Sequence, residues 1–278
     1  MRVTLWGTRG SLAAAGPETV RYGGNTSCVE VRGADGSLLI LDAGTGIRRL
    51  NSAIGSTPRI DLLLTHLHMD HIQGLGFFAA LDDPEREVHI WGPPSITLDL
   101  RVRLGRYMSP PLFPVRLREL RSRLSLHDVP LEGFEIGPFR IGAALVCHPG
   151  PTVGYRISED GVTMAYVPDH EPALGMPRFP GSPEWTSGFD LAADVDLLIH
   201  DAQYTDAEYA ERVGWGHSSV QQTIALAAQA RVDRLVTFHH DPGHDDATLD
   251  RLVDTARRTS DLPFELVPGM EGSHFELG

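Results

Sequence analysis

The sequence predicts an α/β fold of four layers, an αββα sandwich in which two mixed β-sheets pack face to face with helices outside. The first half of the chain is rich in short apolar runs typical of strands, and it begins with hairpin-like pairs. The second half repeats a mixture of strand and helix patterns. No linker or low-complexity segment divides the 278 residues, so residues 1–278 are expected to form a single domain.

The expected strands are short, and several end at polar residues. They are Val3–Trp6, Ser27–Val31, Leu38–Asp42, Ile60–Leu64, Glu87–Trp91, Phe139–Val146, Thr152–Ile157, Val162–Val167, Val195–Ile199, Arg234–Phe238 and Phe264–Val267. Helices are expected at Gly46–Ala53, Ile72–Leu81, Ser95–Leu104, Asp206–Val213, Ser218–Ala230 and Asp246–Arg258. Ser218 or Ser219 would cap the fifth helix, and Asp245 the last.

Residues 105–130 are the least regular region, with three prolines between Met108 and Pro114. They are predicted to form either a rigid loop that lines a pocket or a plain surface excursion. Arginines are concentrated in and just before this region, at Arg101, Arg103, Arg106, Arg116, Arg118, Arg121 and Arg123. A solvated helical face is favoured for them over a local basic patch.

The chain carries a formal net charge of −13. Non-specific nucleic-acid binding depends on Lys and Arg that neutralise phosphates, so this charge weighs against a long polynucleotide partner. No apolar run approaches the roughly 18 residues that span a bilayer, and the N-terminus lacks the apolar stretch of a secretory signal. Cys28 and Cys147 do not make a disulfide framework, and a cytoplasmic location is expected.

The most informative segment is Thr65–His71, in which three histidines and one aspartate follow a short apolar run. His66 and His68 are two positions apart, so at the end of a strand their side chains point the same way. Asp70 and His71 follow where the chain can turn into a helix. Imidazole and carboxylate are the ligands that zinc and neighbouring metals take, and four donors from one turn can serve two ions.

Two simpler interpretations are less favoured. A histidine-rich loop that binds nothing would leave buried polar groups unpaired, at about 1–3 kcal/mol each. A single structural zinc site usually uses a closed, cysteine-rich ligand set, and this chain has only two cysteines.

Later strands are followed by residues of the same chemical types. His148 follows one apolar strand, Asp169 follows another, and His239 and His240 follow a third. This repeated pattern fits side chains that gather at one edge of a sheet, and with residues 66–71 they complete a set of seven ligands. The spacing alone leaves open whether His239 or His240 is the last member.

With these positions, the chain resembles the metallo-β-lactamase fold superfamily, and most of all its ribonuclease Z and phosphoribosyl cyclic phosphodiesterase branch. The resemblance spans nearly the whole chain. It is carried by the His66–His71 motif with His148, Asp169 and His239, and by segments 6–11, 22–27, 41–46, 198–203 and 216–219. It implies the four-layer fold and a hydrolase with two divalent metal ions, zinc by default, with manganese or iron as the other candidates.

The resemblance also implies roles for individual residues. His66, His68 and His148 would hold one metal, while Asp70, His71 and His239 would hold the second. Asp169 would bridge the two ions. Two metals can share a hydroxide nucleophile and clamp a phosphoryl group, and Asp70 can orient or deprotonate the attacking water.

His217 is similar to a histidine that stands near the scissile phosphate in the ribonuclease Z branch, where a carboxylate pairs with it. Asp201 stands where that branch has a glutamate. A carboxylate partner would orient the imidazolium and raise its pKa, so that it stabilises phosphoryl charge or protonates the leaving oxygen. The simpler alternative is that His217 packs near the start of the Ser218–Ala230 helix.

The chain departs from long ribonucleases of this branch, because it has no basic, glycine- and proline-rich arm that grips tRNA. Together with the acidic charge, this favours a small or cyclic phosphodiester as the partner and makes a long nucleic acid unlikely. No membrane partner is expected, and the oligomeric state is open, a homodimer included. The alternatives are a hydrolase of carboxylic esters, thioesters or lactams with the same fold, and a non-catalytic metal-binding protein.

Overall fold

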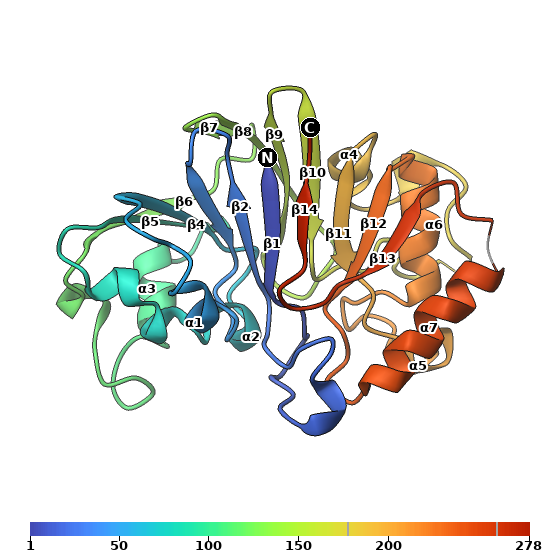
Figure 1. Cartoon of the computed structure of the whole chain (residues 1–278), viewed down its shortest axis with the longest axis horizontal. Coiled ribbons are helices and arrows are strands. Elements are labelled where there is room, and N and C mark those ends of the chain that lie inside the picture. The colour runs from blue at the N-terminus through green and yellow to red at the C-terminus, as the bar shows by residue number, and fades with distance from the viewer. Residues whose placement is uncertain (177, 260) are drawn as a thin grey trace.

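The computed structural model describes residues 1–176, 178–259 and 261–278, and in this part of the chain two seven-stranded sheets form the centre of the molecule (Figure 1). The first sheet runs in the order β14-β1-β2-β3-β4-β5-β6 and the second in the order β13-β12-β11-β10-β9-β8-β7. The strands of the first sheet are β1 Arg2–Gly7, β2 Cys28–Arg32, β3 Leu38–Leu41, β4 Arg59–Leu63, β5 Glu87–Gly92, β6 Arg123–Asp128 and β14 His274–Glu276. Those of the second are β7 Phe134–Ile136, β8 Phe139–Leu145, β9 Val153–Glu159, β10 Val162–Val167, β11 Leu197–Asp201, β12 Arg234–Phe238 and β13 Glu265–Pro268.

Both sheets are mixed. In the first sheet β14, β1, β2 and β3 pair antiparallel, whereas β3 to β6 pair parallel. In the second sheet β7 to β10 pair antiparallel, whereas β10 to β13 pair parallel. Parallel strands present their carboxyl ends at one edge, and this edge of each sheet carries the polar residues discussed below.

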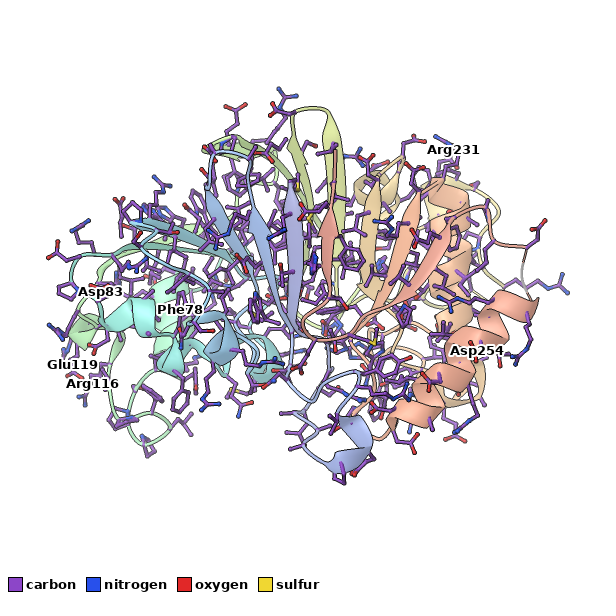
Figure 2. All side chains as sticks on the ribbon, in the orientation of Figure 1. Phe78, Asp83, Arg116, Glu119, Arg231 and Asp254 are labelled. Carbon is purple, nitrogen blue, oxygen red and sulfur yellow. The ribbon has the colours of Figure 1, made fainter. Side chains whose placement is uncertain are left out.

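Helices cover the outer face of each sheet, which confirms the predicted four-layer αββα sandwich (Figure 1). Helices α1 Ile47–Leu50, α2 Met69–Ile72 and α3 Leu100–Gly105 pack on the first sheet. Helices α4 Phe189–Ala192, α6 Val220–Ala230 and α7 Asp246–Thr259 pack on the second, and α5 Asp206–Ala210 precedes α6. Between the sheets lies a third apolar cluster that includes Leu5, Val29, Tyr155 and Phe238, and side chains fill this space throughout (Figure 2).

The predicted caps are present at the two long helices. Ser219 Oγ accepts from the Gln222 N–H, and Gln222 accepts from the Ser219 N–H, which makes a capping box at α6. Asp245 accepts from the Thr248 N–H at the start of α7.

The predicted helix Ile72–Leu81 is wrong in extent, because α2 ends at Ile72 and only two short 3-10 turns follow, at Leu75–Phe77 and Ala79–Asp82. The cause is a close approach at Gly74. A Cβ placed there would lie 2.2 Å from the Gly44 carbonyl oxygen, so the chain packs backbone against backbone at this point. Strands β6, β7 and β14 and helix α4 were not predicted from the sequence.

Strand β6 also shows that residues 105–130 are more regular than the sequence indicates. Arg123 begins this strand, and Arg116 and Arg118 lie in or beside a 3-10 turn, so the predicted common helical face for the seven arginines is wrong. Arg116 pairs with Glu119 at the surface (Figure 2), with 3.3 Å between Nη1 and Oε1. Only Arg101 and Arg103 belong to α3, with Arg106 at its end.

Among the residues that the structure places, no helix is both long enough and apolar enough to cross a bilayer. That residues 1–278 form a single domain stays a prediction.

Candidate metal centre

The seven predicted ligands come from four connections that follow strand ends. His66 and His68 follow β4, and Asp70 and His71 lie in α2, directly after them. His148 follows β8, Asp169 follows β10 and His239 follows β12. Strands β10 and β12 are both parallel to β11, so their carboxyl ends meet at one edge of the second sheet.

The structure brings all seven side chains together in two adjoining groups. The first contains His66, His68 and His148, and it reaches solvent because His68 is exposed. The second is fully buried and contains Asp70, His71, Asp169 and His239. Within each group the donor atoms lie within 4.8 Å of one another. Two further groups add His217 and Asp201 to the same centre.

Four histidines of the cluster turn Nε2 toward its interior, namely His66, His71, His148 and His239. His68 instead presents Nδ1, which lies 3.2 Å from His148 Nε2. In three of those four histidines Nδ1 donates to a fixed acceptor outside the cluster, which leaves the lone pair of Nε2 free for a metal. The acceptors are Asp42 Oδ2 for His71 at 2.8 Å, Gln203 Oε1 for His239 at 2.9 Å and the Gly216 carbonyl for His148 at 2.8 Å.

Buried polar atoms without partners also point to a cation. His66 Nε2 is buried and makes no hydrogen bond within the described part of the chain, and the buried Asp169 Oδ1 has only the ion-pair contact with His71 Nε2. Such groups cost about 1–3 kcal/mol each when they stay unsatisfied. Both atoms face the cluster, since His66 Nε2 is 3.7 Å from Asp169 Oδ2 and Asp169 Oδ1 is 2.9 Å from His71 Nε2. A set of imidazoles and carboxylates with these orphaned atoms therefore fits divalent metal ions.

The electrostatics of the cluster favour positive charge at its centre. Burial alone would raise the pKa of Asp169, but the imidazoles of His239 and His71 outweigh burial and hold it well below its usual range. Burial would likewise lower the pKa of His71, yet the carboxylates around it raise that pKa well above its usual value. The carboxylates thus stabilise a positive charge at the centre of the cluster.

Asp42 is a functional residue that the sequence analysis did not assign. It is fully buried at the end of β3, and Oδ2 accepts from His71 Nδ1 and from the Tyr166 hydroxyl, the latter at 3.0 Å. Thr65 donates to the same carboxylate from its N–H and its hydroxyl, and His66 Nδ1 lies 3.1 Å from that hydroxyl. Asp42 therefore orients one histidine of each group. The signal that could have identified Asp42 in the sequence is its position directly after the apolar strand Leu38–Leu41.

His217 and Asp201 form the predicted pair. His217 Nδ1 lies 2.7 Å from Asp201 Oδ2, so an aspartate reaches the imidazole although it is shorter than a glutamate. Burial would lower the pKa of His217, but the Asp201 carboxylate outweighs it and raises that pKa to about 9. The His217 ring stacks on His239 at a centroid distance of 4.9 Å. This contact places His217 directly beside the cluster, and its catalytic role stays a prediction.

Backbone donors fix the carboxylate of Asp201. It is fully buried and accepts from the N–H groups of His170, Gln203 and Ser218 at 3.0–3.2 Å. Glu171, also fully buried, accepts from the N–H groups of Gly214 and Gly216 and from the Tyr209 hydroxyl. Glu171 thereby positions the loop that carries His217 and the carbonyl bound by His148, a role that the sequence analysis missed.

The structure shows that His239, and not His240, lies in the cluster. His239 Nε2 lies 3.1 Å from Asp70 Oδ2 and 3.3 Å from Asp169 Oδ2, inside the cluster. His240 points away, and its Nε2 donates to the Gly269 carbonyl at 2.9 Å. Gly10 leaves the space for His239, because a Cβ there would lie 2.3 Å from its Nδ1.

His239→Ala is expected to lower the bound metal by about one equivalent per chain, because it removes a donor that reaches both carboxylates of the buried group. His240→Ala, its matched control, is expected to retain the full metal content. Elemental analysis of both purified variants checks this. Equal metal loss in the two variants would contradict the assignment of His239.

Comparison of the chain with known proteins shows which family it resembles. Residues 38–240 match the family model of the beta-lactamase superfamily domain. The chain is 29% identical to ribonuclease Z of Haloarcula marismortui over 94% of its own length and 92% of that protein. It is also 29% identical to ribonuclease Z of Myxococcus xanthus, with 96% and 95% of the two chains covered.

Solved structures share the fold at lower identity. The metallo-beta-lactamase fold protein YhfI from Bacillus subtilis superposes with a TM-score of 0.72 at 19% identity, with 99% of each chain covered. The short form of human tRNase Z superposes with a TM-score of 0.68 at 22% identity, with 100% of each chain covered.

These relatives correct one prediction. The expectation of a small phosphodiester partner, with a long nucleic acid unlikely, is wrong, because the curated relatives matched over nearly their whole length are ribonucleases. The physical reason is that a net charge of −13 is a sum over the whole chain. It includes carboxylates that lie within the metal cluster and in surface ion pairs, and it does not describe the charge beside the site.

Proposed function

The chain belongs to the beta-lactamase superfamily and is a metal-dependent hydrolase of the phosphodiesterase type, and from this premise we propose that it cleaves a phosphodiester bond in RNA. The observation that carries the proposal is the position of the Asp201–His217 pair directly beside the cluster of histidines and aspartates. The relatives named ribonuclease Z support RNA as the substrate class.

We assign the metal donors by the two groups of the cluster. His66, His68 and His148 would hold one ion, and Asp70, His71 and His239 the other. Asp169 would lie between them, since its Oδ2 is 3.8 Å from His148 Nε2 and 3.3 Å from His239 Nε2. When bound, two divalent ions would activate water and offset charge on the phosphoryl group. Zinc is the expected metal, and manganese or iron also suits this donor set.

The chain's own residues would direct water and protons around the phosphate. Asp70 Oδ2 accepts from the Ser11 N–H at 2.8 Å, which fixes a carboxylate that can take a proton from the attacking water. His217, cationic through its pairing with Asp201, would donate its Nε2 proton to the oxygen that leaves as its bond to phosphorus breaks. Its Nδ1 proton stays in the hydrogen bond with Asp201.

The test uses the metal-replete protein with two substrates, a precursor tRNA with a 3′ trailer and bis(p-nitrophenyl) phosphate. We expect both to be hydrolysed, both activities to be lost in excess chelator, and both to return when zinc is restored. Hydrolysis of bis(p-nitrophenyl) phosphate without cleavage of any RNA in a panel of structured and single-stranded substrates would contradict RNA as the substrate.

A further inference from the structure

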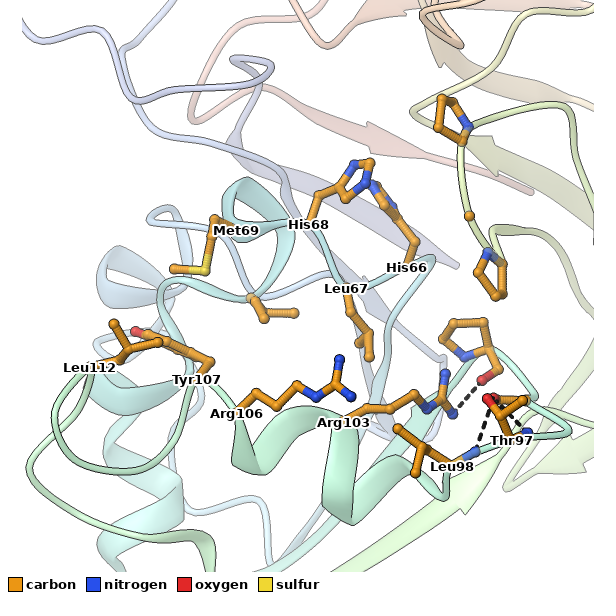
Figure 3. A pocket seen from close by; sticks show the side chains of 16 residues that line it. His66, Leu67, His68, Met69, Thr97, Leu98, Arg103, Arg106, Tyr107 and Leu112 are labelled. Carbon is orange, nitrogen blue, oxygen red and sulfur yellow. Dashed lines mark hydrogen bonds between the residues drawn. The ribbon is translucent and has the colours of Figure 1, made fainter.

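A cavity of about 560 Å³ adjoins the metal cluster on its solvent-exposed side (Figure 3). His66 and His68 form part of its wall, so a molecule bound there would lie directly beside the first donor group. Its volume is within the range of sites that bind small ligands or single units of a polymer. The predicted role of residues 105–130 as a pocket wall is confirmed in part, since Tyr107 and Leu112 line this cavity.

Two arginine side chains, Arg103 and Arg106, lie along one wall of the cavity, on the side away from His66 and His68 in the view of Figure 3. The Arg106 guanidinium is exposed and forms no hydrogen bond or ion pair with any residue that the structure describes. Arg103 is held by the Pro93 carbonyl at 2.7 Å and by Asp128 at 3.2 Å, while its buried Nε has no partner among the described residues.

The remaining lining is mostly apolar. Leu67, Leu98 and Ile72 contribute aliphatic surface, and Tyr107 contributes an aromatic ring. Met69 and Leu112 stand at the rim with 49% and 69% of their surfaces exposed. No acidic residue occurs among the described residues that line the cavity. The cavity therefore combines an apolar surface, suited to a flat ring, with unneutralised positive charge, suited to an anion.

We propose that this cavity binds one nucleotide of a single-stranded RNA segment next to the scissile phosphodiester. The base would lie against Leu67 and Leu98, and the backbone phosphate would bind Arg106 with help from Arg103. Proteins that bind single-stranded RNA combine contacts to the flat faces of its bases, most often from aromatic side chains, with phosphate contacts from arginine. Here the aliphatic wall would contact the flat face of the base. The inference rests on the proposed function, because it concerns the same substrate, and it adds the residues that select it.

Arg106→Ala tests the proposal, with Arg101→Ala as the matched control. Both arginines belong to or end α3, but Arg101 does not line the cavity. For a single-stranded oligoribonucleotide, Arg106→Ala is expected to raise KM about tenfold with little change in kcat. Hydrolysis of bis(p-nitrophenyl) phosphate, which has no second phosphate for Arg106 to bind, is expected to stay within about twofold. Arg101→Ala is expected to leave both substrates within about twofold.

A binding measurement separates this inference from the proposed function. The fluorescence anisotropy of a labelled oligoribonucleotide is followed in excess chelator, so that the probe stays intact. Arg106→Ala is expected to weaken its binding about fivefold or more, and a probe with one abasic nucleotide is expected to bind the unaltered protein more weakly. If the protein binds the probe in this way but cleaves no RNA, the proposed function fails while the cavity assignment stands.

Two results would overturn the cavity assignment. One is equal behaviour of Arg106→Ala and Arg101→Ala in both the kinetic and the binding measurements. The other is a matching loss of activity of Arg106→Ala on the oligoribonucleotide and on bis(p-nitrophenyl) phosphate, which would give Arg106 a structural role only.

Discussion

Asp169→Asn is expected to lower kcat/KM for bis(p-nitrophenyl) phosphate and for RNA by about a thousandfold or more. Its carboxylate is the group that reaches both parts of the metal cluster. Asp169 oxygens lie within 2.9–3.9 Å of imidazole nitrogens of His71, His239, His66, His148 and His217. An amide would remove the negative charge from the centre of these groups, and its NH₂ would face nitrogen lone pairs that need a cation.

The measurement pairs steady-state kinetics with elemental analysis of the purified variant. Asp160→Asn is the control, because Asp160 is exposed in the turn between β9 and β10 and has a positive φ of 49° that asparagine also tolerates. We expect the control to retain both metal and activity. Near-normal turnover by Asp169→Asn at full metal content would remove Asp169 from the assigned centre.

His217→Ala is expected to lower the rate of hydrolysis of the two substrates by different factors. Cleavage of RNA should fall by about a hundredfold or more, because the alkoxide that leaves needs a proton and His217 is placed to supply it. Hydrolysis of bis(p-nitrophenyl) phosphate should fall much less, because p-nitrophenolate leaves without a proton. Asp201→Asn should change RNA cleavage in the same direction, since it weakens the 2.7 Å pairing that keeps His217 cationic.

Metal content makes this result interpretable. His217→Ala should keep its metal, because the seven assigned donors are unchanged, and His274→Ala, at an exposed histidine of β14, should behave as the unaltered protein. An equal loss on both substrates would contradict a role for His217 as proton donor. Loss of metal from His217→Ala would instead show that it serves mainly to hold the cluster.

Most positions that gather in the cluster could be predicted because their signals are local. The spacing of His66, His68, Asp70 and His71 is set by one strand-to-helix turn, so no distant contact was needed to place them together. His148 and Asp169 were found by one repeated pattern, a polar donor after an apolar run. Parallel strands bring such positions to a common edge, so local sequence and sheet geometry agree there.

Other features had no local signal. The helix expected at Ile72–Leu81 stops early because Gly74 packs against the Gly44 backbone, a contact between segments about thirty positions apart in the chain. Strand β14 is short and finds its place only by pairing with β1, at the other end of the sequence. Asp42 follows an apolar strand, as several of the predicted ligands do. Its role depends on tertiary contacts, because its carboxylate accepts hydrogen bonds from both His71 and Tyr166.

The sequence by itself indicated the four-layer fold through its strand and helix patterns, the types of donor through the residues that follow its strands, and the family through the resemblance of its motifs. Only the tertiary structure decided which groups meet. In that structure Asp201 and His217 form a hydrogen bond, and His239 points into the cluster whereas His240 points away from it. Arg106 lines the apolar cavity that adjoins His68. The physical reason is that these distances follow from sheet register and packing, and the net charge of a chain carries no information about where its charges lie.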